Sequence, residues 1–475
     1  MTEGTIRQNL WDGKVCQQLD LGMLQEALPV ARIEELLETY QMWEEREQKL
    51  NMVAMVYWLM ALHLYPNMSQ RAVYGKLVSG LRSTRDDVPE QIPVKSAFSY
   101  RREQLGREIL EELFHDFARP QATVETPGAF WRGMRLLALD GTRESVPDTL
   151  ANRETFRYST DDKDSHSPYP QARVVLLIEC ATHLICDAEI TSCREGETHG
   201  ARRLVARHNW EQTLLLWDSG FHANRALFQI RSLNGHVLGR LRSTILPKPL
   251  VTLCDGSYLV LIREERDHRT GPQMLVRVIT STFTDPRIPG AGLETYRLVT
   301  TLLDPFLYPA KDLVVLYHER WHVELVIGET RNAMRLSEWT LRSRTPEGVI
   351  QELYALLLVH ILVRTLMLRA ANAAAIAPTS LSFTATLRIL DDNLVPLSQV
   401  TVLRRAHMVT NVIQEIGQQR LPRQRVRIQA RVVKRSRSRY PRKKPEHWQA
   451  PPLELDLDFH QIIEIVVSTS SGGSS

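Results

Sequence analysis

Two apolar segments that each end in an acidic residue constrain the fold of this chain more than any other feature. Residues 134–142 read MRLLALDGT, and residues 212–221 read QTLLLWDSGF. Runs of this length next to turn-forming residues predict buried strands. They place Asp140 and Asp218 at the carboxyl-terminal tips of those strands, the edge where sites form in open α/β sheets. One acid after a strand is often only a turn residue, but two in the same local position predict a shared site.

A third acidic residue lies in the segment from Tyr317 to Arg331. Treated as a helix, with about 100° between residues, the segment gathers a polar stripe within roughly 60° of arc beside an apolar face. The stripe consists of Tyr317, Arg320, Glu324 and Arg331. Its carboxylate suits a divalent metal, and its other side chains suit phosphate oxygens. The alternative is a solvated helix face with an Arg320–Glu324 ion pair.

A metal site is favoured when Glu324 is considered together with Asp140 and Asp218. Three converging carboxylates repel one another unless cations lie between them. Oxygen ligands without cysteine or clustered histidine suit magnesium or manganese. The sequence offers no convincing Ser-His-Asp or Cys-His arrangement for a nucleophilic side chain.

The pattern of periodicity divides the chain into five segments. Residues 1–125 predict helices only, and residues 126–242 alternate strands with helices. Residues 243–312 predict a separate β-rich segment that interrupts this α/β pattern. Residues 313–375 hold the Glu324 segment and a long apolar helix, and residues 376–475 add helices, a basic stretch and a Ser/Gly-rich end. We therefore expect an α/β core with a β-rich insertion and helical regions on either side.

The helical amino-terminal segment has features of a DNA-binding unit. Its expected helices cover residues 21–40, 46–65, 70–81 and 92–117, with Ser69 as the cap of the third. The fourth carries three basic residues: Lys95, Arg101 and Arg102. Two helices with a short connection and a basic second helix resemble a helix-turn-helix. The alternative is a plain helical bundle with basic surface residues.

The net charge of +4 is mild, but the basic residues are unevenly distributed. Between Arg420 and Lys444 there are twelve Lys or Arg residues and no acid. This stretch, which includes Lys434 and Arg435, predicts either nucleic-acid binding or a solvated tail.

The five cysteines and the apolar runs predict a cytoplasmic protein. The number of cysteines is odd, no CxxC occurs and no signal peptide is evident, so we expect reduced thiols and no disulfide framework. Core packing of Cys180, Cys186 and Cys193 is favoured over a zinc site because no fourth ligand has suitable spacing. The apolar runs 52–65 and 353–368 are too short to span a bilayer and predict buried helices.

Taken together, these motifs resemble the DDE transposases of the insertion-sequence-4 family. Residues 139–142, followed by Val146-Pro147-Asp148-Thr149 and Asn152, are similar to the family's first-aspartate region, and residues 218–221 resemble the second. The Tyr317-x2-Arg320-x3-Glu324-x6-Arg331 segment matches the family's Y-R-E-K signature, with Trp321 in its usual place. Residues 92–101 resemble the end of the family's amino-terminal domain.

The sequence departs from the family pattern at two points. The last signature position is Arg331 instead of lysine, which keeps the charge but changes its geometry. In some relatives a tryptophan of the β insertion stacks on a flipped base during hairpin formation, whereas here no Trp lies between Trp217 and Trp321. The aromatic residues that offer a stacking face instead are Tyr258, Phe283, Tyr296, Phe306 and Tyr308.

The resemblance implies an RNase H-like catalytic core and a cut-and-paste DNA transposase. Asp140, Asp218 and Glu324 would then hold two Mg2+ ions, with Mn2+ as a substitute, for end cleavage and strand transfer. Tyr317, Arg320, Trp321 and Arg331 would bind DNA beside the cut. It further implies terminal inverted repeats and target DNA as partners, a homodimer in the DNA complex and a prokaryotic, nucleoid-associated location. Two alternatives stay open: a nuclease of the same fold without strand transfer, and a non-catalytic DNA-binding derivative.

Overall fold

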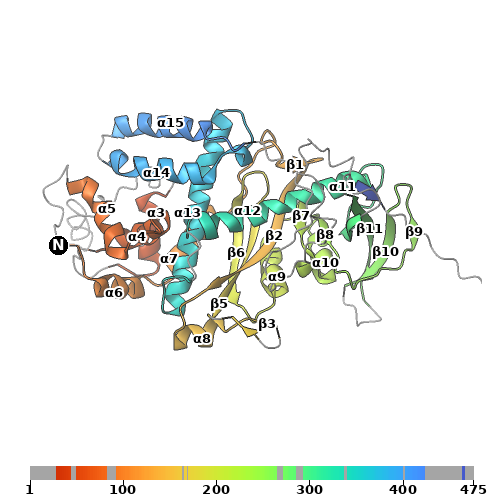
Figure 1. The fold of residues 1–475 in the computed structure, drawn as a ribbon, viewed down its shortest axis with the longest axis horizontal. Helices are drawn as coiled ribbons and strands as arrows, with labels where there is room; N and C mark the ends of the chain where they lie inside the picture. The colour runs from red at the N-terminus through yellow and green to blue at the C-terminus, as the bar shows by residue number, and fades with distance from the viewer. Residues whose placement is uncertain are drawn as a thin grey trace, which may run out of the picture. The chain divides into compact units, whose positions relative to one another are not determined.

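The computed structural model describes ten stretches of the chain and shows two compact units. The described residues are 28–43, 50–82, 92–162, 165–167, 169–264, 271–284, 292–335, 340–398, 402–422 and 463–465. The first unit comprises residues 1–130, 141–200 and 322–420, and the second comprises residues 131–140, 201–321 and 421–475. Each unit is therefore assembled from separate stretches of chain. Figure 1 labels their helices and strands.

The amino-terminal part of the first unit is helical, as the sequence predicts. Its helices are α3 (Val30–Thr39), α4 (Met52–Leu64), α5 (Gln70–Arg82), α6 (Lys95–Leu105) and α7 (Glu108–Phe117). Ser69 caps α5, because its hydroxyl accepts a hydrogen bond from the Ala72 amide at 3.2 Å. The expected single helix over 92–117 is wrong, since Gly106 separates α6 from α7 with φ at +62°, a conformation that favours glycine.

A long helix, α13 (Pro346–Ala373), forms the core of the first unit. It begins at a Thr345 cap with proline at the first helical position, and it packs against α4, α7 and strand β6 (Figure 1). By length and composition α13 could cross a membrane, but 89% of its apolar window is buried inside the protein. It is the predicted buried helix, and α14 (Phe383–Ser398) and α15 (Val402–Gln418) pack beside it.

The first unit also contains strands. They are β3 (Thr160–Asp162), β4 (Ser165–His166), β5 (Gln171–Glu179) and β6 (Leu184–Ser192), with helix α8 (Leu150–Phe156) preceding them. Strands β5 and β6 form an antiparallel hairpin with a turn at His183, which has a left-handed φ of 59°. In the sheet order β6-β5-β2, the hairpin lies next to strand β2 (Met134–Ser145), whose residues from Gly141 onwards belong to this unit.

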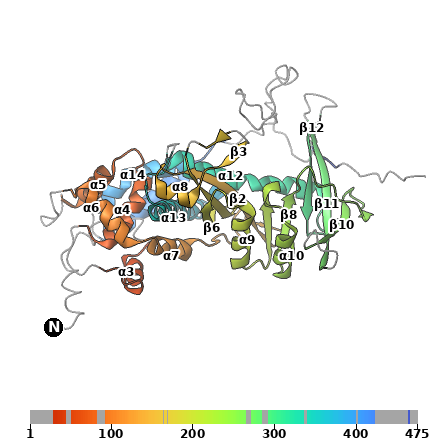
Figure 2. The same cartoon turned by 90° about the horizontal axis from the view of Figure 1, so that it is seen from below.

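The second unit is built on parallel strands that continue the sheet order from β2 to β7 and β8. Strand β7 (Thr213–Trp217) pairs in parallel with β2 and with β8 (His236–Arg240). All five residues of β7 are buried, which is typical of a parallel strand whose two faces are both covered. Helix α9 (Glu197–Arg207) precedes β7, and α10 (Asn224–Ser232) connects β7 to β8 and lies alongside β8 (Figure 2).

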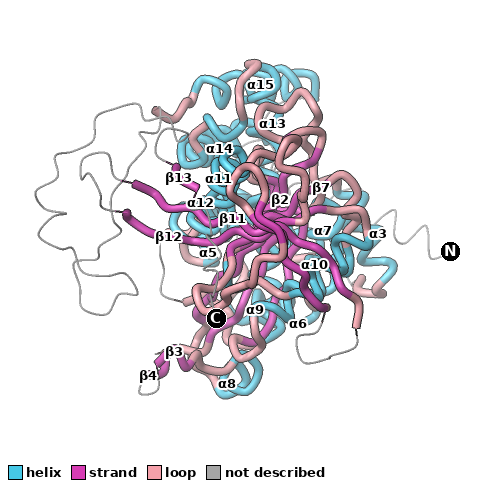
Figure 3. The backbone as a smooth tube through the Cα atoms, turned by 90° about the vertical axis from the view of Figure 1, so that its right-hand side faces the viewer, coloured by secondary structure: helices cyan, strands magenta, loops and turns pink. Residues whose placement is uncertain are grey.

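The β-rich segment expected to be separate is hydrogen-bonded to these core strands. Strand β12 (Gly292–Thr300) pairs antiparallel with β8, so the sheet continues through β11 (Gln273–Thr284), β10 (Tyr258–Arg263) and β9 (Val251–Thr252). Figure 3 shows β11 and β12 side by side. The short strand β13 (Ile463–Ile465) pairs with β11 at Ser281–Phe283. The insertion therefore extends the core sheet of the second unit.

The segment with the Y-R-E-K signature is helical but not one regular helix. Helix α11 (Ala310–Leu316) is followed by a 3₁₀ turn, η2 (Tyr317–Arg320), then by α12 (Trp321–Gly328) and by a π-helical turn, η3 (Glu329–Ala333). The expectation of a constant 100° per residue is therefore wrong, because 3₁₀ and π turns rotate the chain by different amounts. The 3₁₀ turn lies within the signature, and the π-helical turn overlaps its end at Arg331. The boundary between the units falls after Trp321.

The predicted fold class holds at a coarse level, because the chain is a mixed α/β protein with a large sheet and many helices.

Candidate active site

Asp140 and Asp218 occupy neighbouring positions in the second unit. Strands β2 and β7 are parallel, and their last register pair is Leu139 with Trp217. The next residues, Asp140 and Asp218, therefore both follow the last pair of this parallel ladder, whose strands lie about 4.8 Å apart. Both side chains are half-buried. The sequence prediction that these acids share one edge is consistent with this register.

The two aspartates reach that edge in different ways. Asp218 follows the last residue of β7, as predicted. Asp140 lies inside β2, which continues to Ser145, so it is not at the tip of its own strand. It lies instead just after the last β2–β7 pair, and its side chain is 20% exposed.

Tyr317 and Arg320 contact this edge from the 3₁₀ turn η2. The Tyr317 hydroxyl donates a hydrogen bond to the Trp217 carbonyl oxygen at 3.1 Å, and burial raises the pKa of this phenol well above its usual range. The Arg320 guanidinium lies 3.4 Å from the Asp140 carboxylate and is almost fully buried. The turn η2 therefore places the Arg320 cation beside Asp140. It also places the neutral Tyr317 hydroxyl on the carbonyl of Trp217, the residue before Asp218.

Arg240 is a functional candidate that the sequence analysis missed. In the register between β7 and β8, the last pair is Trp217 with Gly239, so Arg240 and Asp218 are the residues that follow the end of this ladder. Its guanidinium lies 5.3 Å from the centre of the Tyr296 ring, and that ring lies 6.3 Å from the Tyr317 ring. The signal by which the sequence could have identified Arg240 is its place at the end of the strand after β7, because β8 ends at this residue.

Glu324 and Arg331, the later part of the signature, belong to the first unit. Glu324 is half-buried in the middle of α12. Arg331 lies in the π-helical turn with its side chain 52% exposed, and its Nε is 3.8 Å from a Glu144 carboxylate oxygen. The buried Arg335 forms an ion pair with the same carboxylate. Glu144 therefore holds the base of the Arg331 side chain while the rest of its guanidinium faces solvent.

The other predicted DNA-contacting residues have varied surroundings. Trp321 is half-buried, with the Arg320 guanidinium 5.7 Å from its ring. Lys95 is exposed, but Arg101 is buried and donates to the Leu50 carbonyl at 2.8 Å, and Arg102 donates to Gln351 at 2.8 Å. DNA contacts by Lys95, Arg101 and Arg102 remain a prediction. Arg101 and Arg102 already form hydrogen bonds with other parts of the protein. Lys434 and Arg435 lie outside the described residues.

The predicted stacking aromatics also differ in exposure. Tyr258 is buried and Tyr296 is half-buried, whereas Phe306 is 81% exposed. Tyr308 is half-buried and lies 5.8 Å from the Trp131 ring. Phe306 therefore has the most accessible ring of these four.

No group of three or more His, Cys, Asp or Glu side chains arranged to hold a metal ion occurs among the residues that the structure describes. Asp140 and Asp218 nevertheless fit one half of such a site, because they bring carboxylate oxygens of two strands to one edge. Their oxygen-only chemistry suits a hard divalent cation.

Comparison with known proteins identifies the class. The family description "Transposase DDE domain" matches residues 131–362, which contain Asp140, Asp218 and Glu324. A second description, "Insertion element 4 transposase N-terminal", matches residues 18–115. The chain is therefore a DNA transposase, an enzyme with a DDE domain, and such domains in general depend on divalent metal ions.

Individual relatives indicate the family within this class of transposase. The transposase InsG of insertion sequence element IS4, from Escherichia coli strain K12, is 29% identical over 355 residues, which cover 73% of this chain and 78% of InsG. The chain belongs to the insertion-sequence-4 family of DDE transposases.

Two further similarities are more distant. InsZ of the same strain, provisionally named a transposase, is 25% identical over 136 residues, or 29% of this chain and 45% of InsZ. Among solved structures, the piggyBac transposase in its synaptic complex with hairpin DNA is similar with a TM-score of 0.44 and 12% identity, over 77% of each chain.

Proposed function

We propose that this transposase cuts DNA at the ends of its insertion element and joins the cut ends to target DNA, on a core of the RNase H-like type. The observation that supports this most directly is the register of β2 and β7, because Asp140 and Asp218 are the residues that follow the last pair of these parallel strands, Leu139 with Trp217. Two acids at the end of this ladder, together with a further acid that the sequence signature supplies at Glu324, are the parts that metal-dependent phosphodiester chemistry requires.

Asp140, Asp218 and Glu324 are proposed as the metal ligands, with two Mg2+ ions per site and Mn2+ as a substitute. Bound divalent cations would activate the attacking water or 3′ hydroxyl and neutralise charge on the phosphorus. The protein itself then needs no nucleophilic side chain, because phosphoryl transfer depends mainly on positioning and electrostatics.

The cations around the aspartates are proposed to position the DNA. Arg320 lies beside Asp140, and Arg240 follows the last pair of β7 and β8, as Asp218 does. Guanidinium groups of this kind bind phosphate oxygens in a bidentate manner. Arg331, exposed and held at its base by Glu144, would bind a further phosphate.

The remaining assignments follow from the family. Terminal inverted repeats and target DNA are the proposed partners, and a homodimer is proposed in the DNA complex, because two ends must be joined together. The amino-terminal helices and the basic stretch 420–444 would add contacts whose strength falls steeply with salt. We propose a cytoplasmic, nucleoid-associated location.

The test uses the full chain, Mg2+ and a DNA duplex that carries the ends of its own element. Asp140→Asn, Asp218→Asn and Glu324→Gln should each abolish cleavage, measured on a denaturing gel, while filter or gel-shift assays show that DNA binding persists. Asp312→Asn is the matched control, since this half-exposed acid of the second unit pairs with Arg132 and its loss should leave cleavage intact. Substantial cutting by any of the three would refute the ligand assignment.

A strand-transfer assay separates the two alternative functions from this one. Oligonucleotides with pre-cut ends should become joined to a target plasmid when the proposal holds. Cutting without joining would identify a nuclease of the same fold, and binding with neither activity would identify a non-catalytic derivative.

A further inference from the structure

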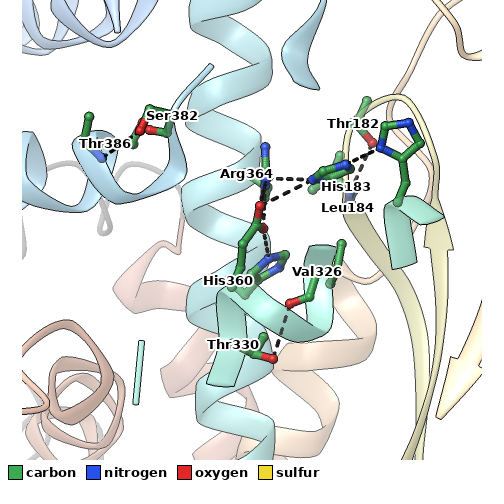
Figure 4. Close-up of polar contacts among 12 residues, drawn as sticks. Thr182, His183, Leu184, Val326, Thr330, His360, Arg364, Ser382 and Thr386 are labelled. Carbon is green, nitrogen blue, oxygen red and sulfur yellow. Dashed lines mark hydrogen bonds and ion pairs between the residues drawn. The ribbon is translucent and has the colours of Figure 1, made fainter. Parts of the chain in front are cut away.

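A buried polar network lies in the first unit, beside the helix that carries Glu324. Its members are Glu329, His183, His322, His360 and Arg364. They come from four parts of the fold: the β5–β6 turn, α12, η3 and α13. Figure 4 shows Arg364 and His360 on α13, with Arg364 directed toward His183. The proposed function leaves these residues without a role.

Glu329 is the centre of the network. Its side chain is 14% exposed, and Arg364 binds both carboxylate oxygens through Nη2 and Nε, the latter at 3.0 Å. The His360 Nε2 donates to one of the same oxygens at 2.8 Å. Such a forked, charge-assisted arrangement fixes both the position and the plane of a carboxylate.

The charges of the network are balanced around Glu329. Burial alone raises the pKa of this carboxyl, but the Arg364 charge and the hydrogen bond from His360 hold it well below its usual value. Arg364 is 2% exposed. Glu329 is therefore ionised and neutralised inside the protein, and both of its oxygens are engaged. This makes it an unsuitable metal ligand and leaves Glu324, five residues earlier, as the better candidate.

His183 links the network to the start of the same helix. Its Nδ1 lies 2.7 Å from Arg364 Nη2. Because a guanidinium can only donate, Nδ1 must accept, and the ring proton is on Nε2. That Nε2 lies 2.7 Å from Nδ1 of His322 and donates to it. Burial and the Arg364 charge lower the pKa of His183 to about 3, in agreement with a neutral ring.

The helical segment around Glu324 is thus fixed at two points. His322, two residues before Glu324, is held by His183 of the β5–β6 turn, and Glu329, five residues after it, is held by Arg364 and His360 of α13. Two attachments that flank a residue fix both the rotation and the axial position of its helix. The π-helical turn begins at Glu329, and π turns occur often at functional sites.

We propose that Glu329 is a positioning residue, which with its partners His183, His360 and Arg364 holds the α12 helix so that Glu324 is presented to the metal. This inference rests on the proposed role of Glu324. In this proposal the network acts through the helix and not by direct contact with DNA. Ligand-supporting residues of this type typically contribute about 10- to 100-fold in metal affinity or activity.

The experiment compares Glu329→Gln and Glu329→Asp with Glu352→Gln in the full chain. Glu352 is a matched control because it is also a buried acid of the first unit. It lies on α13 and accepts hydrogen bonds from Ser343 and the Arg342 amide. Two properties are measured: hydrogen exchange of the backbone amides in residues 321–333, and cleavage of element-end DNA over a series of Mg2+ concentrations.

Glu329→Gln should speed amide exchange in residues 321–333 by about tenfold or more. It should also lower cleavage by about 10- to 100-fold and shift the Mg2+ requirement upward. Glu329→Asp keeps the charge and should recover part of both effects. Glu352→Gln should leave exchange in 321–333 and the Mg2+ requirement at wild-type values, whatever it does to thermal stability.

Unchanged exchange and unchanged cleavage in Glu329→Gln would overturn the proposal. If that variant does not fold, the same result in Glu329→Asp overturns it. Glu324→Gln is included as a reference to separate the two proposals. Cleavage by Glu324→Gln would show that the proposed function is wrong, whereas an inactive Glu324→Gln beside a fully active, normally protected Glu329→Gln would show that only the positioning role is wrong.

Discussion

Gly239 makes the position of Asp218 sensitive to a single methyl group. Gly239 lies on β8 directly opposite Trp217, the residue before Asp218. A Cβ atom at position 239 would lie 2.0 Å from the Trp217 Nε1 and 2.3 Å from its Cδ1. Ordinary contacts between such atoms begin at about 3.5 Å, so Gly239→Ala requires the ring and the strand to separate by about 1.5 Å.

This separation should affect both stability and activity. Trp217 is buried, and inserting a methyl group into a packed core costs about 1–3 kcal/mol. Because Trp217 and Asp218 are consecutive, the displacement passes directly to the carboxylate. A shift of about 1 Å in a catalytic group can lower the rate by about 100-fold. We therefore expect Gly239→Ala to lower the melting temperature by several degrees and cleavage by about two orders of magnitude.

A double-mutant cycle with Trp217→Leu identifies the clash as the cause. Leucine removes the ring atoms that the new methyl group would meet, so Gly239→Ala should be much less harmful in that background than in the wild type. Gly271→Ala provides the control, since a Cβ there meets no atom within 4 Å. Melting curves and nicking rates are measured for the wild type, the two single variants and the double variant, with Gly271→Ala beside them. Equal effects of Gly239→Ala in both backgrounds would refute it.

Two further predictions concern the signature and the core. Arg331→Ala should reduce cleavage more than Arg331→Lys, because lysine keeps a cation that Glu144 can hold; equal activity of the two variants would remove its phosphate-binding role. His63 is buried in α4, and burial lowers its pKa to about 4. Because the unfolded chain takes up a proton below about pH 6.5 and the folded chain does not, this residue should lower the free energy of unfolding by about 2 kcal/mol between pH 6.5 and pH 5. Urea unfolding at pH 7.5 and pH 5 should show a smaller difference for His63→Gln than for the wild type, and an equal difference would contradict the assignment.

Local periodicity was sufficient to predict most elements of this fold. The apolar runs that became β2, β7 and α13 were long and regular, and hydrophobic pattern is strongest there. Features that depend on distant partners were not predictable in the same way. The pairing of β12 with β8 joins the insertion to the core, and no property of residues 243–312 alone specifies that hydrogen bonding.

The break at Gly106 shows a limit of a different kind. Glycine within a helical pattern is tolerated at a modest cost, so its presence alone does not end a helix. Here the residue adopts a positive φ and separates α6 from α7. The expectation of one helix over 92–117 was wrong because a pattern of apolar residues does not indicate whether a glycine adopts a positive φ.

The candidate site was predictable where chemistry and strand position coincide. Asp140 and Asp218 each follow an apolar run, and these runs pair in parallel up to Leu139 and Trp217, the residues before the two acids. Glu329 carried no comparable signal, because its partners His360 and His183 lie 31 and 146 residues away in the sequence. One clue was present: a charged residue such as Arg364 within an apolar helix has to be paired with another charge.

Two acids of strand β2 form ion pairs with arginines in or beside the signature segment. Asp140, in the second unit, binds Arg320, and Glu144, in the first unit, binds Arg331 and Arg335. Residues 140, 142 and 144 alternate with the residues between them, so both acids project from the same face of the strand. Each acid therefore orients an arginine of the signature segment within its own unit. Arg320 sits beside a proposed metal ligand, whereas Arg331 is held by a buried acid and extends into solvent, which suits it to DNA phosphate more than to the metal site.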